Sequence, residues 1–270
     1  MSKDQVQNII IFGAGACEDL PIDFICDRFE EVVLVDNDNE VLLNSKKYIP
    51  THMEQKVTYV VMDVAGLMSQ FMQEISSGNI DSYEKGIRYL NEISHDLPEI
   101  ILPKEILEKM PFSFVVSDLI ISQICNDYLL MLSMLTTSKY KVSSGVDISL
   151  FSKSIILKHI ELLHSLCSPT GRVMVLADTF SLGTEIDGSD SAFNMVLQDY
   201  GSSILQEENI TNSMIVEWFS KYPHIIGGNI LSVLKKHKYN KLELDTMYFG
   251  WWKFSLKQMY FVICHVFLPL

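Results

Sequence analysis

The sequence predicts an α/β domain built on a mostly parallel sheet. Residues 9–12 form a continuous apolar run, which is typical of a parallel strand buried on both faces. Gly13 and Gly15 follow at once, and glycine permits positive φ and close approach of a ligand to the backbone. After a segment that can form a helix, residues 32–35 give a second apolar run that ends at Asp36. This order of strand, glycine turn, helix and strand is the opening of a nucleotide-binding, Rossmann-like domain.

Asp36 stands at the carboxyl end of the second predicted strand. An acid in this place can accept hydrogen bonds from both ribose hydroxyls of an adenosine. Asp36 could instead cap the helix expected in the following segment, and capping is compatible with ribose binding. We therefore expect Gly13, Ala14 and Gly15, together with Asp36 and the adjacent Asn37, to contact a nucleoside-bearing ligand.

Glu18 occupies the third glycine position of the G-x-G-x-x-G pattern, and Asp19 follows it. A dinucleotide places its pyrophosphate against the helix N-terminus, so these acids would set like charge beside phosphate in the first helical turn. NAD and FAD are therefore disfavoured. S-adenosyl-L-methionine carries adenosine without phosphate, and its sulfonium and ammonium groups are compatible with acids. Glu18 is thus predicted to lie at the cofactor; the alternative is that both acids only favour the helix N-terminus.

Beyond this opening, the chain resembles the class I S-adenosylmethionine-dependent methyltransferases. Three more apolar runs follow in order, and the tail reads as two strands around a short turn: residues 57–62, 112–116, 172–177, 241–254 and 258–268. The resemblance covers nearly the whole chain. It implies a three-layer α/β/α sandwich, with a mostly parallel seven-stranded sheet that ends in an antiparallel hairpin. The branch of the class that the chain resembles specifies no substrate.

The resemblance also implies positions for the cofactor. Asp63, followed by Val64, stands where these enzymes usually hold the adenine amino group, and Ser117 and Asp118 follow the fourth predicted strand. Asp63 could alternatively cap a helix that begins near residue 65. We expect all four residues to lie at the cofactor site.

One family position departs from the pattern. Members commonly carry Asp or Glu two residues before the first glycine of the turn, and here that position is Ile11. An acidic partner for the cofactor's ammonium group must then come from elsewhere, and Glu18 and Asp19 are the nearest candidates. The third small residue of the turn is Cys17 instead of glycine.

No catalytic residue can be assigned from the sequence. The sulfonium already activates the methyl group, so the protein mainly has to position the acceptor. His159 is a candidate base, although a surface or interior histidine is the commoner case. Asp118 and Asp178 both follow strands, but two acids make a weak magnesium site, and we predict no metal. Trp251 and Trp252, with Tyr248 and Phe249, could line an acceptor pocket, although aromatic residues along a strand more often belong to the core.

The chain of 270 residues is long enough for one large core, and we expect a single domain over residues 1–270. Two stretches exceed the connections of a minimal fold, about residues 64–111 and 180–240. Both contain amphipathic patterns that predict helices. Because each follows the carboxyl end of a strand, they are candidates for a substrate lid over the ligand crevice.

Composition restricts the partners. The net charge of −13 disfavours sequence-independent binding of nucleic acid, because such binding depends on Lys and Arg contacts to phosphate. The five cysteines show no paired spacing and lie in apolar surroundings, as in reduced cytosolic proteins. No signal sequence or membrane-spanning run is recognisable. We expect a soluble, cytoplasmic protein, for which a homodimer is compatible but not required.

The sequence as a whole predicts S-adenosylmethionine-dependent N- or O-methylation of a small-molecule or peptide acceptor. Two alternatives remain open. A non-catalytic S-adenosylmethionine-binding or scaffold protein would explain Ile11 and the lack of an evident base. An NAD-dependent oxidoreductase would use the same strand and turn order, and Glu18 argues against it.

Overall fold

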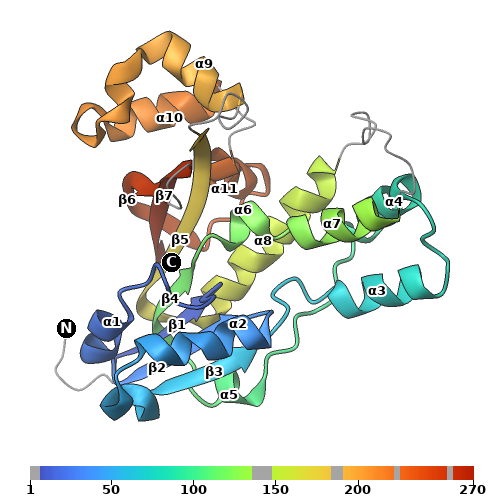
Figure 1. Ribbon diagram of the computed structural model, residues 1–270, viewed down its shortest axis with the longest axis horizontal. Helices are drawn as coiled ribbons and strands as arrows, with labels where there is room; N and C mark the ends of the chain where they lie inside the picture. Colours follow the sequence, from blue (N-terminus) through green and yellow to red (C-terminus); the bar gives the residue numbers. More distant parts are fainter. Residues whose placement is uncertain (1–6, 136–147, 184–190, 222–225, 254–257) are drawn as a thin grey trace.

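A seven-stranded sheet with the order β3-β2-β1-β4-β5-β7-β6 forms the centre of the protein (Figure 1). The computed structural model describes residues 7–135, 148–183, 191–221, 226–253 and 258–270. The strands are β1 (Asn8–Phe12), β2 (Glu31–Asp36), β3 (Val57–Val61), β4 (Phe112–Ser117), β5 (Cys167–Gly183), β6 (Leu242–Lys253) and β7 (Gln258–Pro269). β7 is antiparallel to both β5 and β6, whereas the pairings among β1 to β5 are parallel. The predicted fold class is confirmed.

Alternation along the strands divides the core between the two faces of the sheet. In β1, Ile10 and Phe12 belong to one buried cluster, and Ile9 and Ile11 belong to another. Successive side chains of a strand point to opposite faces, so an unbroken apolar run is what a strand needs when both faces are covered. Helices α1 (Ile22–Arg28) and α2 (Asn39–Asn44) cover the Ile11 face, and α8 (Ser149–Leu166) and α11 (Ile226–Lys236) cover the Phe12 face. The result is the expected three-layer sandwich.

Residues 64–111 form three helices, α3 (Met68–Ser76), α4 (Tyr83–Ile93) and α5 (Lys104–Leu107), as their amphipathic patterns predict. α3 and α4 share a separate core with α7 (Asn126–Met134) and the start of α8. In Figure 1 this helical group lies to the right of the sheet. The shorter elements of the first half are η1 (Ser45–Tyr48), η2 (Thr51–Lys56) and α6 (Ile120–Gln123).

The second expected insertion begins later than predicted. We expected it to start at residue 180, but β5 continues to Gly183 and pairs with β7 as far as the Gly183 to Gln258 partners. The antiparallel partner strand supplies hydrogen bonds to a segment whose small and polar residues resemble a loop. Residues 184–190 of the expected polar stretch lie outside the described residues.

The helices after this gap lie in two places. α11 covers the Phe12 face of the sheet, as described above, and the others lie elsewhere. α9 (Ser191–Tyr200) and α10 (Asn212–Lys221), with η3 (Ser202–Leu205) and η4 (Glu207–Asn209) between them, pack on one end of β5, β6 and β7. Their core includes Trp218 against Phe180 and Phe261. Glu207 accepts a hydrogen bond of 2.6 Å from the backbone N–H of Trp251, which satisfies one donor of edge strand β6. No helix in the described parts of the chain is long and apolar enough to cross a membrane.

The contact between α4 and α7 predicts the effect of a single methyl group. Gly86 is buried, and a Cβ there would overlap with Cδ2 of Leu132, whose side chain is fully buried. We expect Gly86→Ala to lower the free energy of unfolding by about 1–3 kcal/mol through overpacking. Leu132→Ala should lower it by about 2–5 kcal/mol. In the double variant the new methyl group occupies the space that Leu132 leaves. Denaturant titrations should therefore show a smaller loss of unfolding free energy for the double variant than the sum of the losses of the two single variants. Strict additivity would contradict this packing.

Candidate functional site

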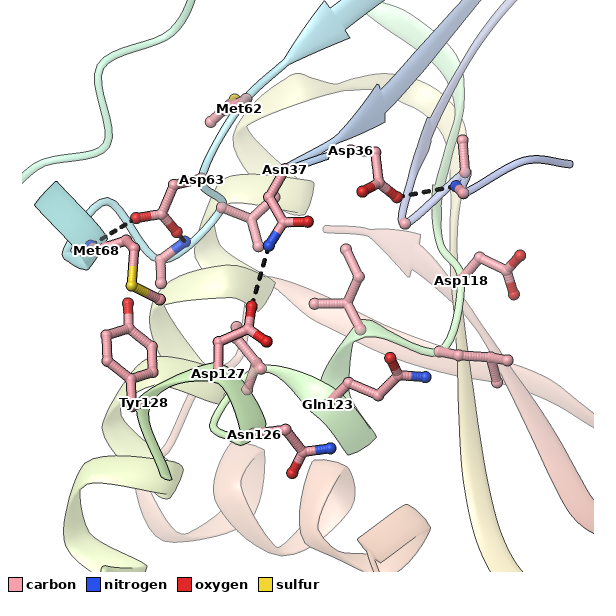
Figure 2. Close-up of a pocket in the computed structure, with 18 of the residues that line it drawn as sticks. Asp36, Asn37, Met62, Asp63, Met68, Asp118, Gln123, Asn126, Asp127 and Tyr128 are labelled. Atoms are coloured by element: carbon pink, nitrogen blue, oxygen red, sulfur yellow. Dashed lines mark hydrogen bonds between the residues drawn. The ribbon is translucent and has the colours of Figure 1, made fainter. Parts of the chain in front are cut away.

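A cavity of about 660 Å³ opens at the carboxyl ends of the parallel strands (Figure 2). Its wall is formed by the turn after β1 and by the segments that follow β2, β3 and β4, with α7 opposite. The lining includes eight of the ten residues expected at the cofactor: Gly13, Ala14, Gly15, Asp36, Asn37, Asp63, Val64 and Asp118. The crevice at the carboxyl ends of the strands is where open α/β sheets bind ligands.

The glycine turn brings the backbone close to the end of β4. Gly13 has a φ of 78°, and its N–H donates to Val35 O at 2.9 Å. A Cβ at Gly13 would overlap with the carbonyl oxygen of Asp118 and would lie 2.8 Å from Cγ1 of Ile120. Glycine is therefore required here both by conformation and by space.

Two residues without glycine's freedom also adopt left-handed conformations beside this turn. Cys17 has a φ of 57° and Leu119 a φ of 55°. Such conformations cost about 1–2 kcal/mol and are concentrated at ligand sites and switch regions. Cys17 thus adopts the conformation that glycine would favour at this position of the family pattern.

Asp36 ties the end of β2 to the glycine turn. Its Oδ2 accepts a hydrogen bond of 2.9 Å from the N–H of Gly15, and its Oδ1 accepts one of 3.0 Å from the N–H of Asp38. The alternative role of Asp36 as the cap of α2 is wrong, because Asp38 is the N-cap and accepts from the N–H groups of Glu40 and Val41. Each carboxylate oxygen of Asp36 retains a lone pair that can accept from a ligand hydroxyl.

Asp63 is not the N-cap of α3, because the helix begins at Met68, later than expected, and its N-cap is Leu67; the Asp63 carboxylate instead binds the backbone just before and at the helix start. Its two oxygens accept from the backbone N–H groups of Ala65 at 2.9 Å and Met68 at 2.8 Å, and Met68 begins α3.

Tyr128 lies on the same side of the cavity as Asp63, and in Figure 2 its hydroxyl points toward Met68. Edge contacts with Phe71 and Phe151 fix the Tyr128 ring. Burial raises the pKa of Tyr128, and the negative charge of Asp63 acts in the same direction, so the hydroxyl stays neutral.

A hydrogen bond crosses the mouth of the cavity. Nδ2 of Asn37, just after β2, donates to Oδ2 of Asp127 on α7 at 3.1 Å (Figure 2). Both side chains are exposed. The bond joins two walls that the sequence places 90 residues apart.

The remaining two predicted cofactor residues lie away from the cavity. The Glu18 carboxylate is 65% exposed and contacts Tyr48 at 3.1 Å and Lys47 at 3.4 Å. The expectation that Glu18 stands in the first helical turn is wrong, because α1 begins only at Ile22, after Pro21. Asp19 lines the cavity instead. Asp19, and not Glu18, therefore places the negative charge that would repel a pyrophosphate.

Ser117 and His159 form a buried pair behind the turn. The Ser117 hydroxyl and His159 Nε2 are 2.8 Å apart, and both residues are fully buried. The His159 ring meets Phe12 edge to face. Burial lowers the pKa of His159 to about 4, so the ring is neutral at physiological pH. His159 does not line the cavity, and this placement argues against its use as a base facing the crevice.

Three carboxylates gather around the end of β4. Burial raises the pKa of Asp118 to about 7, and the negative charges of Asp19 and Asp178 act in the same direction. Burial also raises the pKa of Asp178 to about 6, against a lowering hydrogen bond from Ser122. The described residues contain no group of three or more side chains arranged to hold a metal ion.

Carboxylates dominate the charge of the cavity. Five aspartates line it: Asp19, Asp36, Asp63, Asp118 and Asp127. Among the described lining residues there is no Lys, Arg or His. A ligand that carries positive charge fits this wall, whereas a pyrophosphate would be repelled.

Sequence reasoning missed the α7 side of the site. Gln123, Asn126, Asp127 and Tyr128 line the cavity, and they follow β4 at positions without a motif. The helical insertion at 64–111 contributes Val64, Ala65, Met68 and Ser69, whereas no described residue between 180 and 240 reaches the lining. Of the aromatic residues considered for an acceptor pocket, Trp252 lines the cavity, and Phe249 and Trp251 pack in the core around Phe261.

The strand order and the single reversed strand β7 decide the fold. It is the fold of the class I S-adenosylmethionine-dependent methyltransferases. Among solved structures, this fold is similar to a methyltransferase from Methanosarcina mazei, with 8% identity, a TM-score of 0.46, and coverage of 98% of this chain and 94% of that one. A TehB-like methyltransferase from Corynebacterium glutamicum gives 10% identity, a TM-score of 0.37, and coverage of 98% and 82%. No family model and no curated protein matches the sequence.

The raised pKa of Asp118 predicts how stability responds to pH. Between about pH 4 and 7 the folded protein holds a proton on Asp118 that the unfolded chain releases, so the free energy of unfolding falls as pH rises through this window. Asp118→Asn removes the buried charge. At pH 8 we expect this variant to melt about 2 °C or more above the wild type, and below pH 4 the difference should vanish.

The exposed Asp81, which pairs with Lys85, provides the matched control. Its pKa is lowered by that partner, so Asp81→Asn should bring no stabilisation at pH 8. Equal melting temperatures for wild type and Asp118→Asn at pH 8 would contradict the burial of an ionised Asp118.

Proposed function

We propose that this protein binds S-adenosyl-L-methionine in the cavity and transfers its methyl group to a small-molecule or peptide acceptor. The observation that carries the proposal is the hydrogen bond that joins the glycine turn to Asp36, in a cavity lined by aspartates. The volume of about 660 Å³ lies in the range of ordinary cofactor sites.

The chain's own residues would divide the work of binding. Asp36, already oriented by Gly15, accepts the ribose hydroxyls. The open space at Gly15, where an added Cβ would meet no atom within 4 Å, lets the ligand pass close to the turn. Asp63 and Val64 hold the adenine edge, where hydrogen bonds from the N–H groups of Ala65 and Met68 keep the Asp63 carboxylate in one orientation. When bound, the cofactor supplies a methyl group activated by the sulfonium.

The acceptor would enter beside the cofactor, between the end of β4 and Trp252. α3 and the segment before it form the part of the proposed lid that reaches the cavity. Methyl transfer needs an acceptor held in line with the sulfonium, and Gln123 and Asn126 offer amide groups for its orientation. The whole chain would act as one domain in the cytoplasm.

The proposal predicts a loss of cofactor affinity on removal of the Asp36 carboxylate. Asp36→Ala should weaken the binding of S-adenosylhomocysteine about 10- to 100-fold in calorimetric titration, because hydrogen bonds to a charged acceptor contribute about 1.5–3 kcal/mol. Asp38→Ala is the matched control, since Asp38 caps α2 and does not line the cavity. It should lower stability by about 1 kcal/mol and leave affinity unchanged.

NADH and ATP serve as comparison ligands and should bind far more weakly than S-adenosylhomocysteine. Wild-type affinity retained in a folded Asp36→Ala protein would overturn the role of Asp36. Tight cofactor binding without methyl transfer to any acceptor in a metabolite and peptide screen would favour the non-catalytic alternative, an adenosyl-binding or scaffold protein.

A further inference from the structure

The residue two positions before the glycine turn cannot serve a cationic ligand. Ile11 is 1% exposed and belongs to the core between the sheet and α1. No carboxylate reaches the cavity from this position of β1. If the cavity holds the ammonium group of a ligand, its partner has to come from another strand.

The register of the sheet shows which carboxylate on a neighbouring strand could contact an ammonium group instead. Phe12 of β1 pairs with Val35 of β2 on one side and with Ser117 of β4 on the other. Asp36 and Asp118 each follow directly after these partners, so they stand at the same level on opposite sides of β1. Two strand spacings, about 10 Å, separate their backbones. A ligand with its ribose on Asp36 that extends across Gly13 therefore arrives at Asp118.

Asp118 differs from the other carboxylates of the cavity. Asp36, Asp63 and Asp127 all accept hydrogen bonds within the protein. Asp118 is only 7% exposed and lines the cavity, yet among the described residues its carboxylate has neither a hydrogen-bond donor nor an ion-pair partner. Figure 2 shows it beside the glycine turn, at the end of the cavity away from Asp63. A buried carboxylate without a donor is costly, and a bound cation would remove that cost.

We propose that Asp118 is the binding partner of the ammonium group at the amino-acid end of the cofactor, in place of an acid on β1. The proposal rests on the proposed function, because it assumes the adenosyl cofactor. Asp19 lines the same cavity and adds to the negative potential there. S-adenosylmethionine and S-adenosylhomocysteine both carry the ammonium group, whereas 5′-methylthioadenosine has the same adenosyl part without the amino acid.

The surroundings of Asp118 link this contact to pH. Among the residues that the structure describes, the titratable groups that face it are Cys17 and Asp19 from the β1 to α1 loop, Asp178 from β5 and Cys264 from β7. No cation is among them. Because the pKa of Asp118 is about 7, the Asp118 carboxyl group of the ligand-free protein is partly protonated at neutral pH. An ammonium ligand binds the ionised form, so its affinity should rise between pH 6 and 8, and that of 5′-methylthioadenosine should stay level.

The test is calorimetric titration of two ligands into three proteins. S-adenosylhomocysteine and 5′-methylthioadenosine are titrated into the wild type, Asp118→Asn and the remote control Asp81→Asn, with thermal melting to verify folding. We expect Asp118→Asn to weaken S-adenosylhomocysteine about 10-fold or more, as for loss of a charge-assisted hydrogen bond. The affinity for 5′-methylthioadenosine should change less than about 2-fold, and Asp81→Asn should change neither affinity.

The outcomes separate this inference from the proposed function. If S-adenosylhomocysteine binds the wild type but Asp118→Asn weakens both ligands equally, or neither, the assignment of Asp118 is overturned and the cofactor stands. If the wild type binds neither ligand, the proposed function fails and the assignment fails with it. Should Asp118→Asn not fold, the pH dependence in the wild type decides: parallel curves for the two ligands overturn the assignment.

Discussion

The hydrogen bond from the N–H of Gly15 to the Asp36 carboxylate is the constraint on which the site depends. It joins the turn after β1 to the end of β2, while Asp118 N–H donates to Phe12 O on the other side. Three neighbouring strands thus end in one rigid edge. The floor of the cavity is made of paired backbone, whereas its opposite wall, α7, is joined to the floor by the exposed hydrogen bond between Asn37 and Asp127.

Much of this edge was predictable, because the physics that forms it is local. A strand covered on both faces must be apolar at every position, so the runs in β1 and β2 could be recognised without knowledge of their partners. The turn needs glycine at residue 13 for conformation and space, and an acid at a strand end is exposed to a ligand by topology alone. The reversed strand β7 followed from the resemblance in the tail, and the sheet confirms it.

The parts that sequence reasoning missed depend on contacts between distant segments. The glycine pattern predicts Glu18 at the ligand, in the first turn of a helix, but α1 begins only after Pro21, and the carboxylate contacts Lys47 and Tyr48 at the surface. β5 runs on to Gly183 because β7 offers hydrogen-bond partners. Asp127 and Tyr128 enter the site through the packing of α7 on α3 and α8, and no spacing in the sequence encodes that approach. His159 likewise lies outside the cavity lining because it is buried behind β4, against Ser117.

Electrostatics then connect the geometry to a class of ligand. A cavity walled by aspartates stabilises positive charge, and the turn leaves open space at Gly15. The most direct measurement is a crystal structure of the protein with S-adenosylhomocysteine. We expect the ribose hydroxyls on Asp36 and the adenine beside Asp63. Density for the ligand outside this cavity, or with its ribose turned away from Asp36, would contradict it.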